Sequence, residues 1–215
     1  MRIVAFADTH QFHDELVVPT GDAVVCVGDV CRGGEREELD CFLGWFVALP
    51  HAHKLFVAGN HDRCLETELD DVRQRFPGVR FLQDEGVDVG GVSFWGSPWT
   101  PTYNDWAFML PRGERLAERW SLIPDGVDVL VTHGPPRGIL DDVSAYRTGA
   151  DGAGLGDDER FAGCADLRAR VRVVRPRVHL FGHIHSQPGD RVDDGVRFVN
   201  CTTNECELPC TVVEL

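Results

Sequence analysis

The sequence has no apolar run that approaches the roughly 20 residues a membrane-spanning helix requires. The apolar run at the N-terminus is too short for the core of a signal peptide, and Asp8 ends it. These two absences predict a cytoplasmic protein with no membrane contact. Nothing in the sequence indicates a stable protein partner.

The eight cysteines include no C-x-x-C pair, which excludes a zinc ribbon. Cys26 and Cys41 lie in strand-like and helix-like runs, where each serves as a small apolar residue. Cys201, Cys206 and Cys210 cluster near the C-terminus. A metal site or a disulfide among these three is the minor alternative, because cytosolic thiols stay reduced.

Positive charge is scarce: 21 Lys and Arg face 35 Asp and Glu, for a net charge of −14. An acidic surface repels phosphate backbones, which argues against a protein that coats nucleic acid. Bound divalent cations would reverse the sign of the charge locally, so an anion site on an acidic protein remains open. Charge alone therefore excludes little beyond extended nucleic-acid binding.

The length of 215 residues fits one domain that spans positions 1–215. Short apolar runs typical of strands alternate with amphipathic runs typical of helices, and no internal repeat is visible. The strand-like runs cover 3–7, 23–27, 54–58, 127–132, 178–181, 196–200 and 210–213, with a hairpin at 86–96. The helix-like runs cover 35–49, 66–76, 112–122 and 161–174. This order predicts an α/β fold, a two-sheet mixed β-sandwich flanked by helices.

Five of the strand-like runs lead directly into polar side chains that can bind metals, and the ends of such strands are where α/β active sites gather. The candidate ligands are Asp8, His10, Asp29, Asn60, His133, His183 and His185. This mixture of oxygen and nitrogen ligands without thiolate suits Mn²⁺, Fe or Zn²⁺. Seven ligands exceed the needs of one open site. They predict two divalent ions roughly 3.5–4 Å apart that share a carboxylate.

Each motif alone has an ordinary explanation, since Asp-x-His occurs by chance and Gly-Asp is a common turn. The ordered set of five, each after an expected strand, is what excludes chance. The remaining histidines do not belong to such an ordered set, and ligating histidines need a convergent set of partners. We assign His51, His53 and His179 to structure, and we keep His13 as a weaker candidate because it follows the His10 loop closely.

The pattern D-x-H…G-D…G-N-H-D…H…G-H-x-H, from Asp8 to His185, resembles the calcineurin-like metallophosphoesterase superfamily. Residues 96–101, 105–108, 133–136, 175–176 and 198–200 resemble its MPPED-type phosphodiesterase subgroup in particular. The resemblance implies a first metal on Asp8, His10 and His185. It implies a second metal on Asn60, His133 and His183, with Asp29 as the bridge.

The same resemblance implies that His61 stands near the leaving oxygen, as a general acid or a hydrogen-bond donor to phosphate. Asp62 is then expected to orient His61 through a hydrogen bond. Residues 28–33 depart from the Gly-Asp-x-x-Asp-Arg-Gly stretch of the protein phosphatases, being one residue shorter and without the second Asp. Protein phosphatase activity is therefore not expected. The chain keeps His183, so both metal positions are expected to be filled.

Substrate contacts are less sharply indicated. Five aromatic residues between 95 and 108 form either core or stacking platforms for bases, and we favour core for most of them. The candidate substrate contacts are Arg32, Arg63, Trp99, Tyr103 and Asn104. Asn200 is expected either to touch substrate or to brace ligands. The glycine-rich residues 145–159 form either a solvated surface loop or a lid over the substrate.

The pattern predicts a binuclear phosphodiesterase, with phosphomonoesterase activity as well, that hydrolyses small nucleotide-like phosphoesters through a metal-bridged hydroxide. Mn²⁺ is the expected metal. The first alternative is a nuclease or end-healing phosphoesterase acting on 3′-phosphate or 2′,3′-cyclic phosphate ends of DNA or RNA. The second is a non-catalytic nucleotide-binding or scaffold protein, which complete retention of the ligands disfavours.

Overall fold

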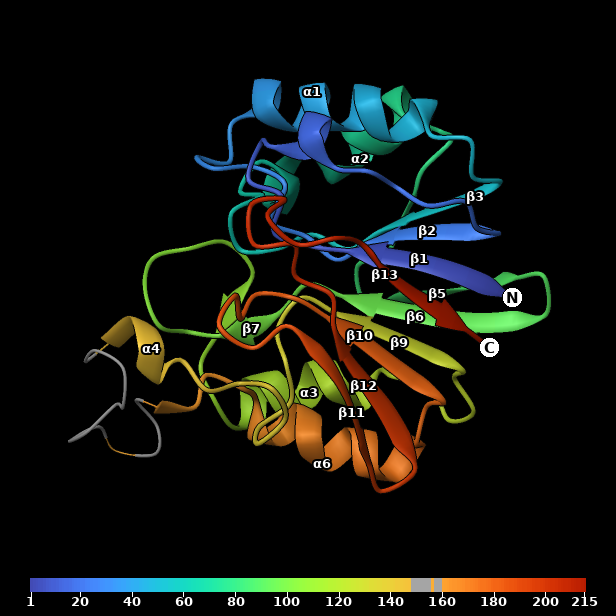
Figure 1. Ribbon diagram of the computed structural model, residues 1–215. Helices are drawn as coiled ribbons and strands as arrows, with labels where there is room; N and C mark the ends of the chain where they lie inside the picture. The colour runs from blue at the N-terminus through green and yellow to red at the C-terminus, as the bar shows by residue number, and fades with distance from the viewer. Residues whose placement is uncertain (148–155, 157–159) are drawn as a thin grey trace.

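Two β-sheets packed face to face form the centre of the molecule, and helices cover their outer sides (Figure 1). The computed structural model describes residues 1–147, 156 and 160–215. The first sheet has the order β13-β1-β2-β3-β4. These strands are Thr211–Glu214, Arg2–Phe6, Ala23–Cys26, His53–Phe56 and Arg80–Phe81. Neighbours are parallel except β13, which runs antiparallel to β1.

The second sheet has the order β11-β12-β10-β9-β6-β5. Its strands are Gly189–Asp193, Val196–Asn200, Val178–Phe181, Val129–Thr132, Val92–Ser97 and Glu85–Val89. The four inner strands are parallel and the two edge strands antiparallel. A small parallel pair, β7 (Thr100–Pro101) with β8 (Met109–Leu110), follows β6.

Helices α1 (Arg36–Ala48) and α2 (Leu65–Arg75) lie on the first sheet, and α3 (Glu114–Ser121) and α6 (Ala165–Val174) lie on the second (Figure 1). A 3-10 turn, η1 (His13–Glu15), and a short helix, α4 (Ser144–Arg147), complete the described elements. Glu35 and Glu38 form a capping box at the start of α1, which satisfies amide groups that the first turn leaves unpaired.

The alternation of side chains along the strands produces three apolar layers. In β1, Val4 and Phe6 face α1, whereas Ile3 and Ala5 face the second sheet. The layer between the sheets is built mainly from Val, Ala and Leu. The third layer lies under α3 and α6, where Trp120 is completely buried. The inner strands β2, β9 and β10 are thus buried on both faces, as parallel sheets require.

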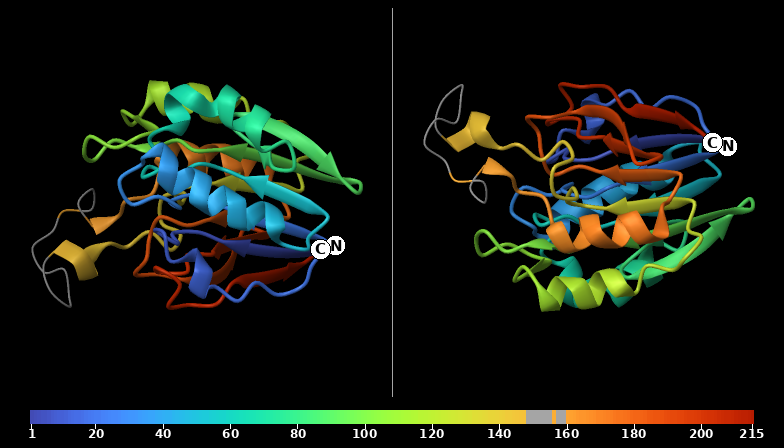
Figure 2. Two further views of the ribbon diagram at one scale, coloured as in Figure 1. Left: turned by 90° about the horizontal axis from the view of Figure 1, so that it is seen from above. Right: turned by 90° about the horizontal axis from the view of Figure 1, so that it is seen from below.

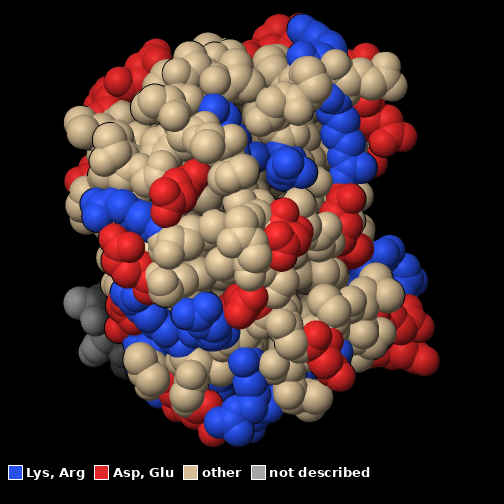
Figure 3. Space-filling view, turned by 90° about the vertical axis from the view of Figure 1, so that its right-hand side faces the viewer, with Lys and Arg blue, Asp and Glu red and all other residues tan. Residues whose placement is uncertain are grey.

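The chain begins and ends at the same edge of the sandwich, where the Met1 amine donates to the Leu215 carbonyl at 3.2 Å (Figure 2). Basic and acidic side chains are interspersed on that face (Figure 3). The parallel strands therefore direct their carboxyl ends to the opposite edge. Within the ranges described, no helix is long and apolar enough to cross a membrane.

The predicted α/β sandwich is confirmed, with boundaries that differ by a few residues. The largest difference is at α6, expected from residue 161 but beginning at Ala165, because Phe161 and Cys164 form bridges with the segment after β9. Strands β4, β7, β8 and β11 were not predicted, and the first three have only two residues each. Most of the loop predicted at 145–159 lies outside the described residues.

Candidate metal centre

The candidate ligands converge at the carboxyl edge, each supplied by the loop after a different strand. Asp8 and His10 follow β1, Asp29 follows β2, and Asn60 with His61 follows β3. His133 follows β9, and His183 and His185 follow β10. Most of these side chains are buried: Asp8 is 0% exposed, Asp29 2% and His133 0%. Buried carboxylates surrounded by imidazoles are costly without a cation, which is the physical mark of a metal site.

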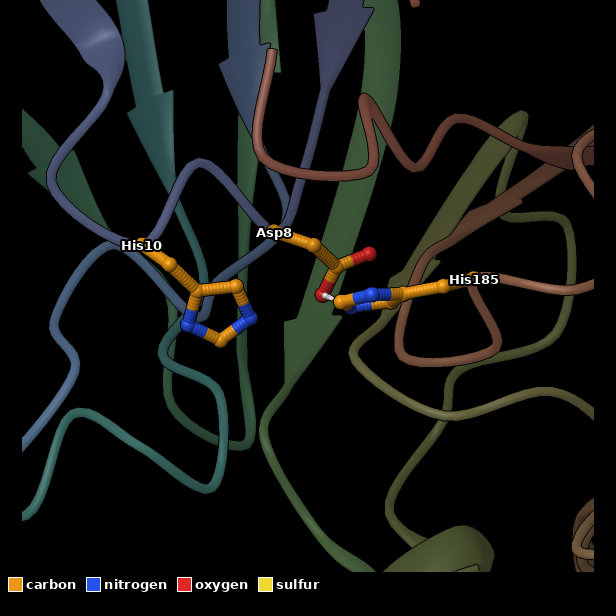
Figure 4. A group of neighbouring side chains, drawn as sticks. All are labelled: Asp8, His10 and His185. Carbon is orange, nitrogen blue, oxygen red and sulfur yellow. Dashed lines mark ion pairs between the residues drawn. The ribbon is translucent and has the colours of Figure 1, made fainter. Parts of the chain in front are cut away.

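Three overlapping groups have ligand atoms within 4.8 Å of one another. They are Asp8 with His10 and His185, then His10 with Asp29 and His61, and then Asp29 with His133 and His183. Figure 4 shows the first group, with the Asp8 carboxylate paired to His185, whose Nε2 lies 3.8 Å from Oδ1. The groups form a continuous chain in which Asp29 occupies the centre.

Asn60 joins the third group through its side-chain oxygen. His133 Nε2 lies 3.0 Å from Asn60 Oδ1 and 3.2 Å from Asp29 Oδ2. The backbone amide of His183 donates to both oxygens of Asp8, at 3.2 and 3.0 Å. This amide belongs to a residue of the third group and fixes the Asp8 carboxylate of the first group. All seven predicted ligands therefore lie together.

Two ligand imidazoles are oriented by main-chain carbonyls. His10 Nδ1 lies 3.0 Å from the Cys31 carbonyl, and His133 Nδ1 lies 2.8 Å from the Val27 carbonyl. Because a carbonyl only accepts, each Nδ1 carries the hydrogen and each Nε2 is left for a cation. Both rings are thus held in the tautomer that metal binding requires.

The backbone is left-handed at four ligands, with φ of 58° at Asp8, 41° at His10, 56° at Asp29 and 69° at His183. Such a conformation costs on the order of 1–3 kcal/mol per residue and persists where the surroundings impose it. Its concentration at one edge of the sheets marks this edge as the functional one.

Gly59 is required by the close approach of two ligands. A Cβ at this position would lie 2.2 Å from Asp29 Oδ1 and 2.6 Å from His133 Cε1. The glycine of the Gly-Asn-His-Asp motif therefore makes room for the Asp29 carboxylate and for the His133 imidazole of the third group.

Asp62 has a different role from the predicted one. The expectation that it orients the His61 ring is wrong, because His61 Nδ1 bonds to the Arg32 carbonyl at 2.7 Å. The Asp62 carboxylate is completely buried and accepts four backbone amides instead. Oδ1 accepts from Val30 and Cys31, and Oδ2 accepts from Asp29 and Gly59, at 2.8–3.0 Å. Asp62 therefore shapes the loop that carries Asp29.

The electrostatics of the metal-free centre favour charged carboxylates. Burial raises the pKa of Asp8, but the hydrogen bond and charge of His185 outweigh burial and hold that pKa below its usual value. Burial likewise opposes ionisation of Asp29, whose pKa is nevertheless lowered by the charge of His133. Burial lowers the pKa of His133, but Asp29 raises it to about 9. Burial and His133 lower the pKa of His183 to about 4.

Residues 1–187 match the family model of the calcineurin-like phosphoesterases. The chain belongs to the calcineurin-like phosphoesterase family. It is 37% identical over 230 residues to human metallophosphoesterase domain-containing protein 1, covering 94% of this chain and 67% of that protein. It is 36% identical over 216 residues to the UPF0046 protein K07C11.7 of Caenorhabditis elegans, covering 93% and 69%. These relatives confirm the resemblance to the MPPED-type subgroup.

The fold is shared with more distant structures. The phosphopantetheinyl hydrolase of Mycobacterium tuberculosis superimposes with a TM-score of 0.62 at 16% identity, over 93% of this chain and 88% of that one. As a member of the calcineurin-like phosphoesterase family, the chain is a metal-dependent phosphoester hydrolase. Its donor set of carboxylate, amide and imidazole fits divalent metals of the Mn²⁺, Fe and Zn²⁺ class.

His61 adjoins the candidate ligands of this phosphoesterase and shares a group with His10 and Asp29. Its ring contacts His10 edge to face, with 4.7 Å between centroids, and lies 4.1 Å from the centroid of Trp106. Its backbone amide donates to Asp29 Oδ1 at 2.7 Å. His61 is thereby fixed beside the centre, with Nε2 as the ring nitrogen that the Arg32 carbonyl leaves free.

The predicted substrate contacts fall into two sets in the structure. Tyr103 is 44% exposed, and its ring lies 5.7 Å from that of His183. Asn104 is exposed on the same loop. Arg32 donates to the His10 carbonyl and keeps an exposed guanidinium. The roles of these three residues stay predictions.

Trp99 and Arg63 have other contacts. The Trp99 indole donates to Asp84 at 2.8 Å and packs between Phe108 and the Arg119 guanidinium. These contacts favour a place in the wall of the fold for Trp99, and its role as a substrate contact stays a prediction. The Arg63 guanidinium lies over Trp106 and donates to the Asp105 carbonyl, so it supports the loop.

His51, His53 and His179 belong to no ligand group among the described residues, as predicted, and neither does His13, which was the weaker candidate. His13 packs against Phe42 and Trp45, and His51 bonds to the Pro19 carbonyl. His179 is buried against Thr132. All eight cysteines are free, and none belongs to a metal-ligating group within the described ranges.

Asn200 braces a ligand loop. Its amide donates to the carbonyls of Ile184 and Gln187 at 2.7 and 2.9 Å, on either side of His185. Sequence reasoning left open whether Asn200 binds substrate or braces, and the structure favours bracing. It included Trp106 among the five aromatic residues and in the segment 105–108 that resembles the MPPED-type subgroup, but assigned this residue no role beside His61.

Proposed function

We propose that this hydrolase is a phosphodiesterase with phosphomonoesterase activity, and that it works with two divalent cations. The observation that carries the proposal is the central place of Asp29. This carboxylate belongs both to the group with His10 and to the group with His133 and His183. A carboxylate shared by two ligand groups is the arrangement that a two-metal phosphoesterase requires.

The first cation would be held by Asp8, His10 and His185, and the second by Asn60, His133 and His183. Asp29 would bind both cations. The four imidazoles favour Mn²⁺ over Mg²⁺ or Ca²⁺, with Fe and Zn²⁺ as the other suitable metals. When bound, the two cations supply Lewis acidity, which lowers the pKa of water and neutralises phosphoryl charge.

The chain itself supplies the group that serves the leaving oxygen. His61 Nδ1 keeps its hydrogen on the Arg32 carbonyl, so proton exchange with substrate takes place at Nε2. In the imidazolium form Nε2 donates to the departing oxygen, and in either form the ring position is the same. The apolar contact with Trp106 on one side limits the access of water to this ring.

We propose small nucleotide-like esters as substrates. Tyr103 offers an exposed aromatic ring beside His183, suited to stack on a base. The exposed Arg32 guanidinium lies one residue from the Asp62-bound loop and 3.8 Å from the exposed Glu205 carboxylate, and it offers charge for a phosphate at the rim in exchange for that surface ion pair. The net charge of −14 argues against a long nucleic-acid substrate.

The test is a substrate panel with Mn²⁺-loaded protein. It compares bis-p-nitrophenyl phosphate, the p-nitrophenyl monoester, 2′,3′- and 3′,5′-cyclic nucleotides, and oligonucleotides with 3′-phosphate ends. His61→Ala should lower turnover about a hundredfold or more while two metal equivalents per chain remain bound. His53→Ala, in the strand β3 away from the ligands, is the matched control. Turnover of no ester with two metals bound would refute the proposal, as would one bound metal.

A further inference from the structure

We propose that Trp106 is a positioning residue for the His61 imidazole. This inference deepens the proposed function and rests on it, because it concerns how the group that serves the leaving oxygen is held. The two rings lie with centroids 4.1 Å apart and planes inclined by 33°. This separation is shorter than the 4.7 Å between the His61 and His10 rings.

A hydrogen bond alone does not fix an imidazole. The bond from His61 Nδ1 to the Arg32 carbonyl, 2.7 Å long, fixes one atom and leaves the ring free to tilt about it. The edge of the His10 ring, 4.7 Å away at 79°, limits this tilt on one side. The indole of Trp106 covers a face of the ring. Together the three contacts determine where Nε2 lies.

Trp106 is itself held on both sides. The Arg63 guanidinium lies 5.2 Å from the indole centroid and donates to the carbonyl of the preceding residue, Asp105. The amide of the next residue, Ala107, donates to the Asn60 carbonyl at 3.1 Å. The hydrogen bond from Ala107 reaches the proposed metal ligand Asn60. The other contacts come from Arg63, the residue after Asp62. The indole is therefore tied to the same loop that carries His61, which gives the pair a fixed geometry.

The consequence is catalytic rather than merely structural. Misplacement of a reacting group by about 1 Å can lower a rate on the order of a hundredfold. Loss of the indole leaves the hydrogen bond to Arg32 intact and lets the ring tilt, so we expect a partial loss, about tenfold in kcat. Substrate affinity should stay within about twofold, because the metal ligands do not change.

The experiment compares Trp106→Ala, Trp106→Leu and Trp106→Phe in the Mn²⁺-loaded protein. Ala and Leu should each lower kcat about tenfold with little change in KM, and Phe, which keeps a flat ring, should restore most of it. The loss should be larger for an alkyl ester than for a p-nitrophenyl ester, since a poor leaving group depends more on protonation. Trp45→Phe, a change between η1 and α1, is the matched control and should keep full activity.

The decisive arm is a double-mutant cycle with His61→Ala. If Trp106 acts through His61, Trp106→Ala should have no further effect once the imidazole is gone. The same tenfold loss in both backgrounds would overturn the inference, as would full activity of Trp106→Leu. If His61→Ala itself costs nothing, the proposed function of His61 fails instead. The two failures are thus distinguishable. Should Trp106→Ala not fold, Trp106→Leu takes its place in the cycle.

Discussion

Replacement of Asp62 by Asn probes the architecture of the centre most directly. The change keeps the size of the side chain and removes one oxygen acceptor. Both carboxylate oxygens are in use, each accepting two backbone amides. Whichever way the new amide is turned, its NH₂ group faces two N–H donors. Two buried donors therefore lose their acceptor.

A buried donor without an acceptor costs about 1–3 kcal/mol, so the pair costs roughly 2–6 kcal/mol. That is a large part of the roughly 5–15 kcal/mol by which a domain is stable. Asp141→Asn is the matched control. Asp141 is also buried, with burial raising its pKa, but the amides of Gly138 and Gly163 both reach the same oxygen, Oδ2. The amide group of Asn then replaces the other oxygen, at a cost of about 1 kcal/mol or less.

The assay is urea unfolding of the three proteins in EDTA, followed by tryptophan fluorescence, with metal content measured separately. Asp62→Asn should unfold at a clearly lower urea concentration than Asp141→Asn. It should also bind metal more weakly, because the displaced amides position Asp29. Equal midpoints for the two variants would refute the reasoning that Asp62 organises this loop.

Three further outcomes are expected. Gly59→Ala should bind fewer than two metal equivalents per chain, as measured by plasma mass spectrometry, because the new methyl group displaces Asp29. The control is Gly44→Ala, where nothing lies within 4 Å of the new methyl group and metal content should stay unchanged. Mn²⁺ at about 100 times its Kd should stabilise the fold by about 2.7 kcal/mol for each occupied site, which calorimetry would detect as a Tm rise that EDTA reverses. His179→Gln should make stability less sensitive to acid. Burial lowers the pKa of His179 to about 3, so its neutral form stabilises the fold above the unfolded value of about 6.5 and this stability is lost as pH falls. At pH 5 the wild type should have lost about 2 kcal/mol that the variant keeps, by urea unfolding at both pH values; parallel losses would contradict the assignment.

The ligands could be predicted because their pattern is local. Each unit of the pattern is a buried strand, a turn and a polar side chain within fewer than ten consecutive residues. Five such units can be recognised in the sequence. The rules of parallel sheets then bring their ends to one edge, so no long-range contact had to be known. The same reasoning placed Asp29 and His133 together although they are 104 positions apart.

The contacts that hold the candidate ligands and His61 in place could not be predicted. They depend on distances in the fold that the spacing of residues along the sequence does not reveal. The neighbour of Asp62 in sequence is His61, and adjacency suggested a partnership. The fold brings the amides of residues 29–31 to the carboxylate instead and gives His61 the Arg32 carbonyl. Trp106 was equally ambiguous, since an aromatic residue in a loop reads as core or wall until its neighbours are known.

The charge of the centre explains how so acidic a protein can bind an anion. The neighbouring histidines hold Asp8 and Asp29 ionised, and burial with the charge of His133 lowers the pKa of His183 to about 4. If the two proposed divalent cations are bound by neutral imidazoles, the two carboxylates leave a net charge of +2 among the ligands. Under the proposed function, the cations are thus a condition for binding the phosphoryl group as well as for its hydrolysis. Phosphate should therefore protect the Mn²⁺-loaded protein against thermal unfolding and leave the EDTA-treated protein unaffected; equal protection of both would place the anion site away from the metals.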